Sequence, residues 1–421
     1  MDVFTYLENI PKWDAFDVIV CGGGLSGIAA ALSAARRGKK VLLLEKQCTL
    51  GGLATAGLVN YWVPLCNGRG KLIIKGMAQE FLQLSVKYGF DTFCPDWKNG
   101  EPSHPTKQRS DSWFSAGIFS LALLKLLKDA GVEILYDALV SVPVMDGHHC
   151  CGVIVDGKSG RRFYGCNMLV DATGDAAVLK QAGVPTVDGT NYFTYYGEGI
   201  TLEGCRKALE KEDIFLAYYH PYGGPANLHG GFHPKDKPLY QGVSMEVINE
   251  YLQENQLLML EKEKDKPRGS RNIHMLPAMP QLRTARRIDA DAVLKGEDCY
   301  HHCETSIGTI CDFEHRDRLY EVPYGTLVKK GFDNMITCGR SAAGEGWGWD
   351  ILRVIPPAVL TGQAAGVAAS IAIDESCPIP EVPIADLQQL LRETGVIIHF
   401  EDSWVPKDDY PDIHAELADH I

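Results

Sequence analysis

The sequence has a deficit of positive charge. It carries 41 Lys and Arg against 54 Asp and Glu, a formal net charge of −13 over 421 residues. Such a balance disfavours sequence-independent binding to nucleic acid or to an anionic membrane surface, because both need basic protein surfaces. We therefore expect no nucleic-acid partner and no membrane partner.

Long apolar runs are also missing. The longest apolar stretch, residues 356–373, is full of Gly, Ala and Ser and contains Gln363, which is typical of a buried helix rather than a membrane span. Residues 1–16 carry three acidic side chains and lack a basic region followed by an apolar one. We therefore expect no signal peptide and a cytoplasmic location.

The 13 cysteines do not form a disulfide or redox pattern. Their number is odd, their spacing is scattered and no Cys-x-x-Cys occurs, so we expect free thiols in a reducing compartment. Cys48 and Cys66 lack the close pair of a disulfide reductase. Residues 299–303, Cys-Tyr-His-His-Cys, have metal-ligand side chains, but an ordinary reduced loop explains them better, and we expect no metal.

One glycine-rich fingerprint stands near the N-terminus. Residues 18–27 read Val-Ile-Val-Cys-Gly-Gly-Gly-Leu-Ser-Gly, and the next apolar run, 41–44, ends in Glu45. This order predicts a dinucleotide-binding strand, helix and strand, with the pyrophosphate at the helix N-terminus and the acid on the ribose hydroxyls. The contacts expected in this unit are Gly22, Gly23, Gly24, Ser26, Gly27, Glu45 and Lys46.

Three later segments favour FAD over NAD. Residues 51–55 are a glycine pair followed by small residues, where many flavoproteins cover the FAD pyrophosphate. Residues 167–175 read as a strand ending in Ala-Thr-Gly-Asp, and 334–340 as a strand ending in Gly-Arg. A simple NAD dehydrogenase is disfavoured by the single fingerprint and the missing Tyr-x-x-x-Lys pair. The FAD contacts expected here are Gly51, Gly52, Ala54, Thr55, Val140, Thr173, Gly174, Asp175, Gly339 and Arg340.

From residue 17 to about 395 the chain resembles the FAD-dependent oxidoreductase family allied to fumarate reductase flavoproteins. Besides the segments above, it has Arg-Thr-Ala-Arg-Arg-Ile at 283–288, Val-Pro-Tyr at 322–324 and Gly-Gln-Ala-Ala-Gly at 362–366. Thr284 stands where the family usually has Glu, and no histidine follows the Gly-Arg pair in residues 344–349. Both departures fall among residues expected to contact the substrate, so the resemblance implies the cofactor but not the substrate.

We predict an α/β fold: a three-layer, Rossmann-like FAD-binding domain with an inserted mixed α+β substrate or cap domain. Between residues 183 and 321 the cofactor motifs vanish, and this stretch is too long for a loop. Helices are expected over 77–88, 115–129 and 247–266, and an antiparallel meander over 139–164. The expected divisions are 17–183 with a connecting region at 58–115, the cap at 184–321, a return segment at 322–375 and a C-terminal tail at 376–421.

A helix is expected over residues 356–371, directly after Arg353 and Ile355, which we include among the FAD contacts. Proline suits the first turn of a helix, and free N–H groups there favour a reduced, anionic flavin. In related flavoproteins a helix N-terminus occupies this place, so the resemblance implies the same role.

Substrate contacts are expected from Arg283, Arg286 and Arg287, which would share one face if this segment is helical. Such a cluster suits an anionic substrate, because guanidinium pairs bidentately with carboxylate. The alternative is structural pairing with a nearby acid, Asp289, Asp291, Glu297 or Asp298. Fumarate reductase relatives use arginine and histidine side chains of the cap domain to bind carboxylate and transfer protons. The resemblance therefore implies three catalytic candidates: Arg283, Arg287 and His274.

Together these features predict an FAD enzyme that transfers a hydride between a small polar organic substrate and the flavin, and the arginine cluster allows this substrate to be carboxylated. An unidentified electron donor or acceptor completes the cycle. The alternative in another class is a flavin-binding protein without net redox chemistry, a ligand sensor or an RNA-modification partner. The negative charge argues against RNA.

Overall fold

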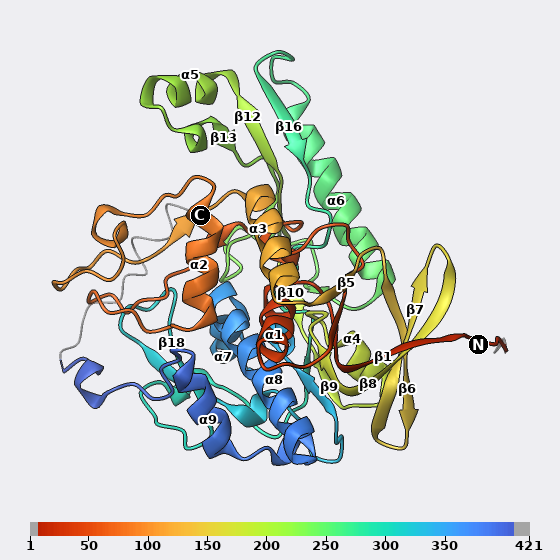
Figure 1. The fold of residues 1–421 in the computed structure, drawn as a ribbon. Helices are drawn as coiled ribbons and strands as arrows, with labels where there is room; N and C mark the ends of the chain where they lie inside the picture. Colours follow the sequence, from red (N-terminus) through yellow and green to blue (C-terminus); the bar gives the residue numbers. More distant parts are fainter. Residues whose placement is uncertain (1–6, 408–421) are drawn as a thin grey trace.

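A computed structural model describes residues 7–407, and within this range the central element is a seven-stranded sheet. The strand order is β5-β2-β1-β8-β7-β6, with β20 also paired to β8 (Figure 1). β1, β2, β5, β8 and β20 run parallel, as the βαβ prediction requires. The strands are β1 (Lys12–Cys21), β2 (Val41–Leu44), β5 (Glu133–Leu135), β6 (Leu139–Asp146), β7 (His149–Gly157), β8 (Gly160–Asp171) and β20 (Met335–Thr337).

β8 joins two parts of the sheet. Its first half pairs antiparallel with β7, which pairs in turn with β6, and this confirms the predicted meander. Its second half lies between β1 and β20, with Val20 and Ile336 both in register with Val170. The carboxyl ends of β1, β8 and β20 therefore meet at one edge, where ligands bind in open α/β sheets.

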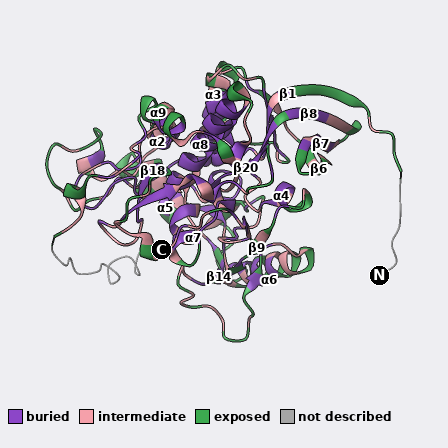
Figure 2. Cartoon of the chain, turned by 90° about the horizontal axis from the view of Figure 1, so that it is seen from below, coloured by how far each residue is buried: buried purple, intermediate pink, exposed green. Residues whose placement is uncertain are grey.

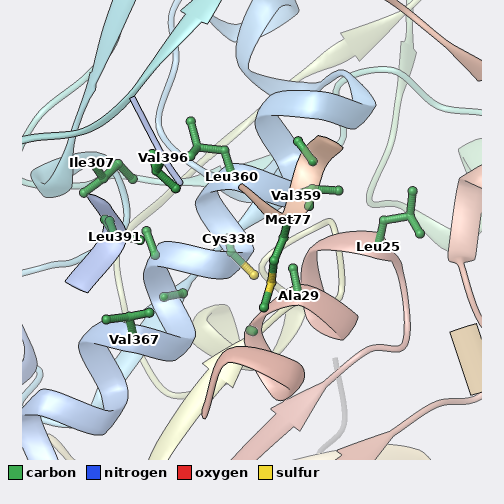
Figure 3. Close-up of a cluster of buried hydrophobic side chains, with 14 of the residues drawn as sticks. Leu25, Ala29, Met77, Ile307, Cys338, Val359, Leu360, Val367, Leu391 and Val396 are labelled. Carbon is green, nitrogen blue, oxygen red and sulfur yellow. The ribbon is translucent and has the colours of Figure 1, made fainter. Parts of the chain in front are cut away.

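Helices pack on one face of the parallel strands and form the larger core with them. On the other face, the parallel strands form a second core with α4 and with side chains of the meander strands β6, β7 and β8. The first face holds α1 packed on α8, and Figure 3 shows Leu25 and Ala29 of α1 near Val359 of α8. The helices are α1 (Leu25–Arg36), α2 (Met77–Lys87), α3 (Ala116–Asp129), α4 (Ala177–Gln181), α5 (Leu202–Lys211), α6 (Met245–Glu263), α7 (Trp347–Arg353), α8 (Ile355–Glu375) and α9 (Ile384–Glu393).

α8 has the length and composition of a membrane span, but 89% of its apolar window is buried inside the fold. Figure 2 shows it in the buried centre of the molecule. Its glycines allow this burial, because a Cβ on Gly362 would lie 2.1 Å from the Ser26 carbonyl oxygen of α1. The predicted buried helix is confirmed, and it begins at Ile355 and ends at Glu375.

Within residues 184–321, the part around α5 and α6 forms small sheets that project away from the central sheet in Figure 1, whereas residues 306–311 pack against α8 and α9. The predicted charged helix is α6. The C-terminal tail predicted over 376–421 contains α9, and its part beyond residue 407 lies outside the described residues. The short strands are β3 (Tyr61–Trp62), β4 (Ser112–Trp113), β9 (Thr186–Asp188), β10 (Thr190–Asn191), β11 (Thr194–Tyr196), β12 (Glu198–Thr201), β13 (Tyr218–Tyr219), β14 (Tyr222–Pro225), β15 (Tyr240–Gln241), β16 (Arg271–Met275), β17 (Arg286–Ile288), β18 (Ser306–Cys311) and β19 (Leu319–Pro323).

The contact between α1 and α8 can be tested with one methyl group. Gly362→Ala places a Cβ against the backbone of Ser26, so the helices must separate, and we expect a loss of about 1–3 kcal/mol in the free energy of unfolding. Gly117→Ala in α3 is the matched control, because its Cβ meets nothing within 4 Å. Urea unfolding of both variants measures the difference. Equal stability of the two would contradict the close packing.

Candidate functional site

The turn between β1 and α1 requires glycine. Gly22 has φ +114°, and a Cβ on it would lie 2.4 Å from the Ala172 carbonyl oxygen. A Cβ on Gly27 would lie 1.9 Å from the oxygen of Gly22. Gly24 differs, because nothing lies within 4 Å of where its Cβ would be. The open space therefore stands in front of Gly24, at the N-terminus of α1, where backbone N–H groups favour an anion.

Glu45 follows β2 and is 6% exposed. Its Oε2 accepts a hydrogen bond from the N–H of Gly23 at 2.7 Å, and its Oε1 accepts one from Gln47 at 2.7 Å. Burial raises the pKa of this carboxyl above its usual value. A carboxylate has about four acceptor positions, so two remain for sugar hydroxyls. The adjacent Lys46 side chain is exposed.

The second glycine pair lies directly on the first turn. Gly51 donates its N–H to the Gly23 oxygen at 2.8 Å. A Cβ on Gly52 would lie 2.9 Å from the Gly24 Cα. The Thr55 hydroxyl donates to the Leu50 carbonyl within the same loop. Residues 51–55 are thus brought to the open space at Gly24, with the Thr55 hydroxyl fixing the loop.

The Ala-Thr-Gly-Asp loop is organised by Asp171, which was not among the predicted residues. This fully buried carboxylate accepts the N–H and the hydroxyl of Thr173, at 3.0 and 2.6 Å, and the N–H of Leu179. Burial raises its pKa. Beyond Gly174, the Oδ1 atom of Asp175 is buried and has no hydrogen-bond partner. An unpaired buried oxygen of this kind is expected where a ligand supplies the donor.

Arg340 connects this loop with the inserted segment. Its Nε donates to the Gly174 oxygen at 2.6 Å, and its Nη1 donates to the oxygen of Leu282. A Cβ on Gly339 would lie 2.5 Å from Ser26 Oγ, so this turn touches α1. Val140, by contrast, is half-buried on β6 and packs with the core on the meander side of the sheet.

The start of α8 has fewer free N–H groups than predicted. Pro356 and Pro357 have no N–H, and Ala358 donates its N–H to the Val354 oxygen at 3.0 Å. Anion binding at this end therefore depends on the helix dipole and on Ile355, because the two prolines remove donors from the first turn.

The prediction that Arg283, Arg286 and Arg287 share a helical face is wrong. Residues 286–288 form β17, which pairs antiparallel with β9, and side chains alternate along a strand. Arg286 pairs with Asp188 at 2.7 Å, an acid nearly a hundred residues earlier and not one of the four nearby acids considered. Strand pairing over this distance overrides local helix propensity.

Arg287 is 8% exposed, and its guanidinium lies over the Trp349 ring, 5.7 Å from the centroid. Its Nη1 donates to the Ile288 carbonyl, whereas its Nε has no partner. Burial lowers its pKa, and Asp289 and Glu345 partly offset this effect.

Arg283 is held differently. Its Nη1 donates to the Asn227 carbonyl at 2.7 Å, and no carboxylate of residues 7–407 lies within 4 Å of its guanidinium. Burial, followed by the neighbouring Arg353, lowers the pKa of Arg283 to about 10. Arg353 bonds to Asp350 through Nε at 2.9 Å. Asp350 is therefore bonded to Arg353 and acts on Arg283 only at longer range, so the Arg283 guanidinium has no contacting carboxylate.

His274 is exposed on β16, where it contacts Glu198 at 3.7 Å and the edge of Tyr218. The structure does not bring it into contact with the predicted arginines. His220 is a stronger candidate that the prediction missed. Its ring stacks on Trp113 with centroids 4.8 Å apart and meets Tyr196 edge to face.

Burial lowers the pKa of His220 below its usual value, which favours the neutral imidazole. Among the described residues its ring nitrogens have no hydrogen-bond partner. The sequence offered one signal: the aromatic stretch 218–225 is rich in groups that bind ligands.

The site has the features of a dinucleotide cradle. Four loops meet at the carboxyl ends of the parallel strands, beside the open space at Gly24, the buried acid Glu45 and the unpaired Asp175 oxygen. This arrangement defines a nucleotide-binding α/β protein, and its donors and acceptors fit FAD.

The chain belongs to the family of FAD dependent oxidoreductases, whose model matches residues 17–237 and 244–391. It is an FAD-dependent oxidoreductase with FAD as its cofactor. The alternative of a simple NAD dehydrogenase is set aside.

Individual relatives match over shorter spans. Protein FixC of Azorhizobium caulinodans is 30% identical over 159 residues, which is 35% of this chain and 34% of FixC. Vinyl phenol reductase of Lactiplantibacillus plantarum is 48% identical over 127 residues, 30% of this chain and 22% of the reductase. A geranylgeranyl bacteriochlorophyll reductase-like structure from Thermoplasma acidophilum is 14% identical, with a TM-score of 0.43, and covers 97% of this chain and 100% of its own.

Glu45 gives a direct test of the nucleotide site. If its free acceptor positions bind ribose hydroxyls, Glu45→Ala should weaken FAD binding by about 1.5–3 kcal/mol, roughly ten- to a hundredfold. Glu133→Ala, at an exposed position on β5, is the matched control and should bind FAD normally. Fluorescence titration of the apoproteins measures both. Unchanged affinity in a folded Glu45→Ala variant would show that the acid only fastens the turn at Gly23.

Proposed function

We propose that this enzyme transfers a hydride between a small carboxylated organic substrate and FAD, and that residues 184–321 cap the reaction site. The observation that carries the proposal is the buried guanidinium of Arg283, which has no contacting carboxylate because Asp350 is bonded to Arg353. Bound FAD supplies the hydride acceptor or donor. The name of the vinyl phenol reductase relative supports redox chemistry on a small molecule.

We also propose the finer kinship with fumarate reductase flavoproteins. The motifs at 283–288, 322–324 and 362–366 support it. In the same way we propose that the glycine loops, Glu45 and Asp175 hold the cofactor.

The inserted segment is built to exclude water from the flavin side of the site. Ala278 donates its N–H to the Ala56 oxygen, and Gln281 Nε2 donates to the Gly57 oxygen, both at 2.8 Å. Tyr196 donates its hydroxyl to the Leu58 oxygen at 2.9 Å. These three hydrogen bonds attach the inserted segment to residues 56–58, the loop that follows the second glycine pair. A dry site strengthens the attraction between a guanidinium and a carboxylate.

Arg283 then binds and orients the substrate carboxylate, because it is buried and, within residues 7–407, no carboxylate lies within 4 Å of its guanidinium. His220 is proposed to hold or accept the proton that accompanies hydride transfer. Its neutral ring suits a general base, and its free nitrogens leave room for a substrate group. Arg287 is assigned a structural role against Trp349.

The general experiment is an anaerobic screen of carboxylic acids and their amides against the purified yellow protein. Bleaching of the bound flavin by members of the acid series, or reoxidation of the reduced flavin by them, would support the proposal. A protein that cannot be loaded with FAD, or that responds equally to amides and acids, would contradict it.

The role of Arg283 can be separated from a structural one. Arg283→Gln should lower kcat/KM for an acid roughly ten- to a hundredfold and lower it much less for the amide, because only the acid loses a charged partner. Arg286→Gln is the matched control, since it breaks the Asp188 pair on the same segment. It should lower the melting temperature and leave the acid-to-amide ratio unchanged. An unchanged ratio in Arg283→Gln would refute the assignment.

The electron partner is a further proposal. The chain has one dinucleotide fingerprint, so we expect no second nucleotide site and slow reduction of the flavin by NADH or NADPH. Stopped-flow absorbance under anaerobic conditions measures this rate. Reduction by either nicotinamide at several per second or faster, typical of enzymatic turnover, would contradict the expectation.

A further inference from the structure

A second cluster of reactive side chains surrounds Glu321 on β19. Its carboxylate is fully buried and lies between two histidines. Oε1 is 2.7 Å from Nδ1 of His302, and Oε2 is 2.8 Å from Nδ1 of His399. His302 follows the loop at 296–298, and His399 follows α9, 78 residues after Glu321. Three segments that are distant in sequence therefore point one ligand group each at a common centre.

The groups around this centre are held in place. The backbone N–H groups of Cys303 and Phe400 donate to the two oxygens of Glu321, at 2.7 and 3.2 Å. The His302 ring stacks on Phe400 with centroids 4.3 Å apart. Its second nitrogen, Nε2, lies 3.0 Å from an oxygen of Asp402. A histidine with one nitrogen toward a centre and the other bonded to a carboxylate is the usual arrangement of a metal ligand.

We propose that His302, Glu321 and His399 bind a divalent transition-metal ion, Zn²⁺ or a close analogue, with water in a fourth position. The ligand atoms all lie within 4.8 Å of one another. Tetrahedral zinc with bonds of about 2.0–2.1 Å needs ligand atoms about 3.4 Å apart, so the two contacts must lengthen by about half an ångström. The imidazoles are 46% and 36% exposed, which gives them room to rotate.

The donor set selects the class of ion. Two imidazole nitrogens and one carboxylate suit zinc and its neighbours, whereas Mg²⁺ and Ca²⁺ prefer all-oxygen sites. Each histidine must carry its proton on Nε2 so that Nδ1 can offer a lone pair, and His302 can then donate to Asp402. The thiol of Cys303 is not part of the set, since it contacts Thr305 Oγ1 at 3.3 Å. The site thus differs from the Cys-Tyr-His-His-Cys pattern considered in the sequence.

Such an ion would fasten the segment after α9 to the body of the protein. This segment is already bonded to β18, through Thr309 N–H to the Ile397 oxygen and Ser306 Oγ to the Ile398 oxygen. The ion would add a third connection, to β19 and to the loop before β18. The inference is independent of the proposed redox reaction, because none of its residues belongs to the FAD site.

The test is calorimetric titration of Zn²⁺ into the FAD-bound full chain after treatment with a chelator. We expect one ion per chain and a rise in melting temperature on binding. His302→Asn and His399→Asn should each weaken binding at least tenfold. Asp402→Asn, at a side chain that is 92% exposed, should weaken it about tenfold without affecting folding. The matched controls are His301→Asn, at an exposed neighbouring position, and Cys303→Ala, and both should bind normally.

X-ray absorption of the zinc-loaded protein should show nitrogen and oxygen ligands without sulfur. Three results would overturn the proposal: no saturable binding, binding that survives both histidine substitutions, or sulfur in the coordination shell. The first would leave the cluster as a set of hydrogen bonds, and the other two would place the ion on other residues. Flavin absorbance, recorded alongside, verifies that each variant is folded.

Discussion

The structure depends on how closely three backbones approach one another around the first turn of α1. Gly22 lies against Ala172 after β8, Gly27 lies against Gly22, and Gly362 of α8 lies against Ser26. Each contact leaves no space for a Cβ, so the sheet, α1 and α8 are held at distances that only glycine permits. Among the glycines of this turn, residues 22, 23, 24 and 27, Gly24 faces open space. The same packing that closes the core therefore leaves a gap at Gly24, where we propose that the pyrophosphate binds.

The parts of the fold that follow local rules could be predicted from the sequence. The βαβ unit, the meander and α8 were predicted close to their observed limits, because hydrophobic period, turn glycines and helix-starting prolines act over a few residues. Arg286 shows where this fails. Its strand pairing with β9 and its ion pair with Asp188 involve residues about a hundred positions earlier, and no local pattern reports them.

The site shows the same division. The glycine loops and Glu45 were predicted from spacing and are brought together at one edge of the sheet. Asp171 was missed, because its role as an acceptor for the following loop appears only when that loop is folded around it. His220 was missed because its neutral state comes from burial against Trp113, on a different part of the chain. Burial, rather than residue type, decides which histidine suits proton transfer.

The two polar clusters differ in how their charge is balanced. Around Glu321, two backbone N–H groups donate to one carboxylate and two imidazoles face its oxygens, so the buried charge has polar partners. Around Arg283, burial and the neighbouring guanidinium of Arg353 disfavour the positive charge, and the carboxylate of Asp350 is bonded to Arg353. A buried charge without a contacting partner is costly. In the proposed reaction, a substrate carboxylate offsets this cost at Arg283, which links substrate selection to the charge balance of the site.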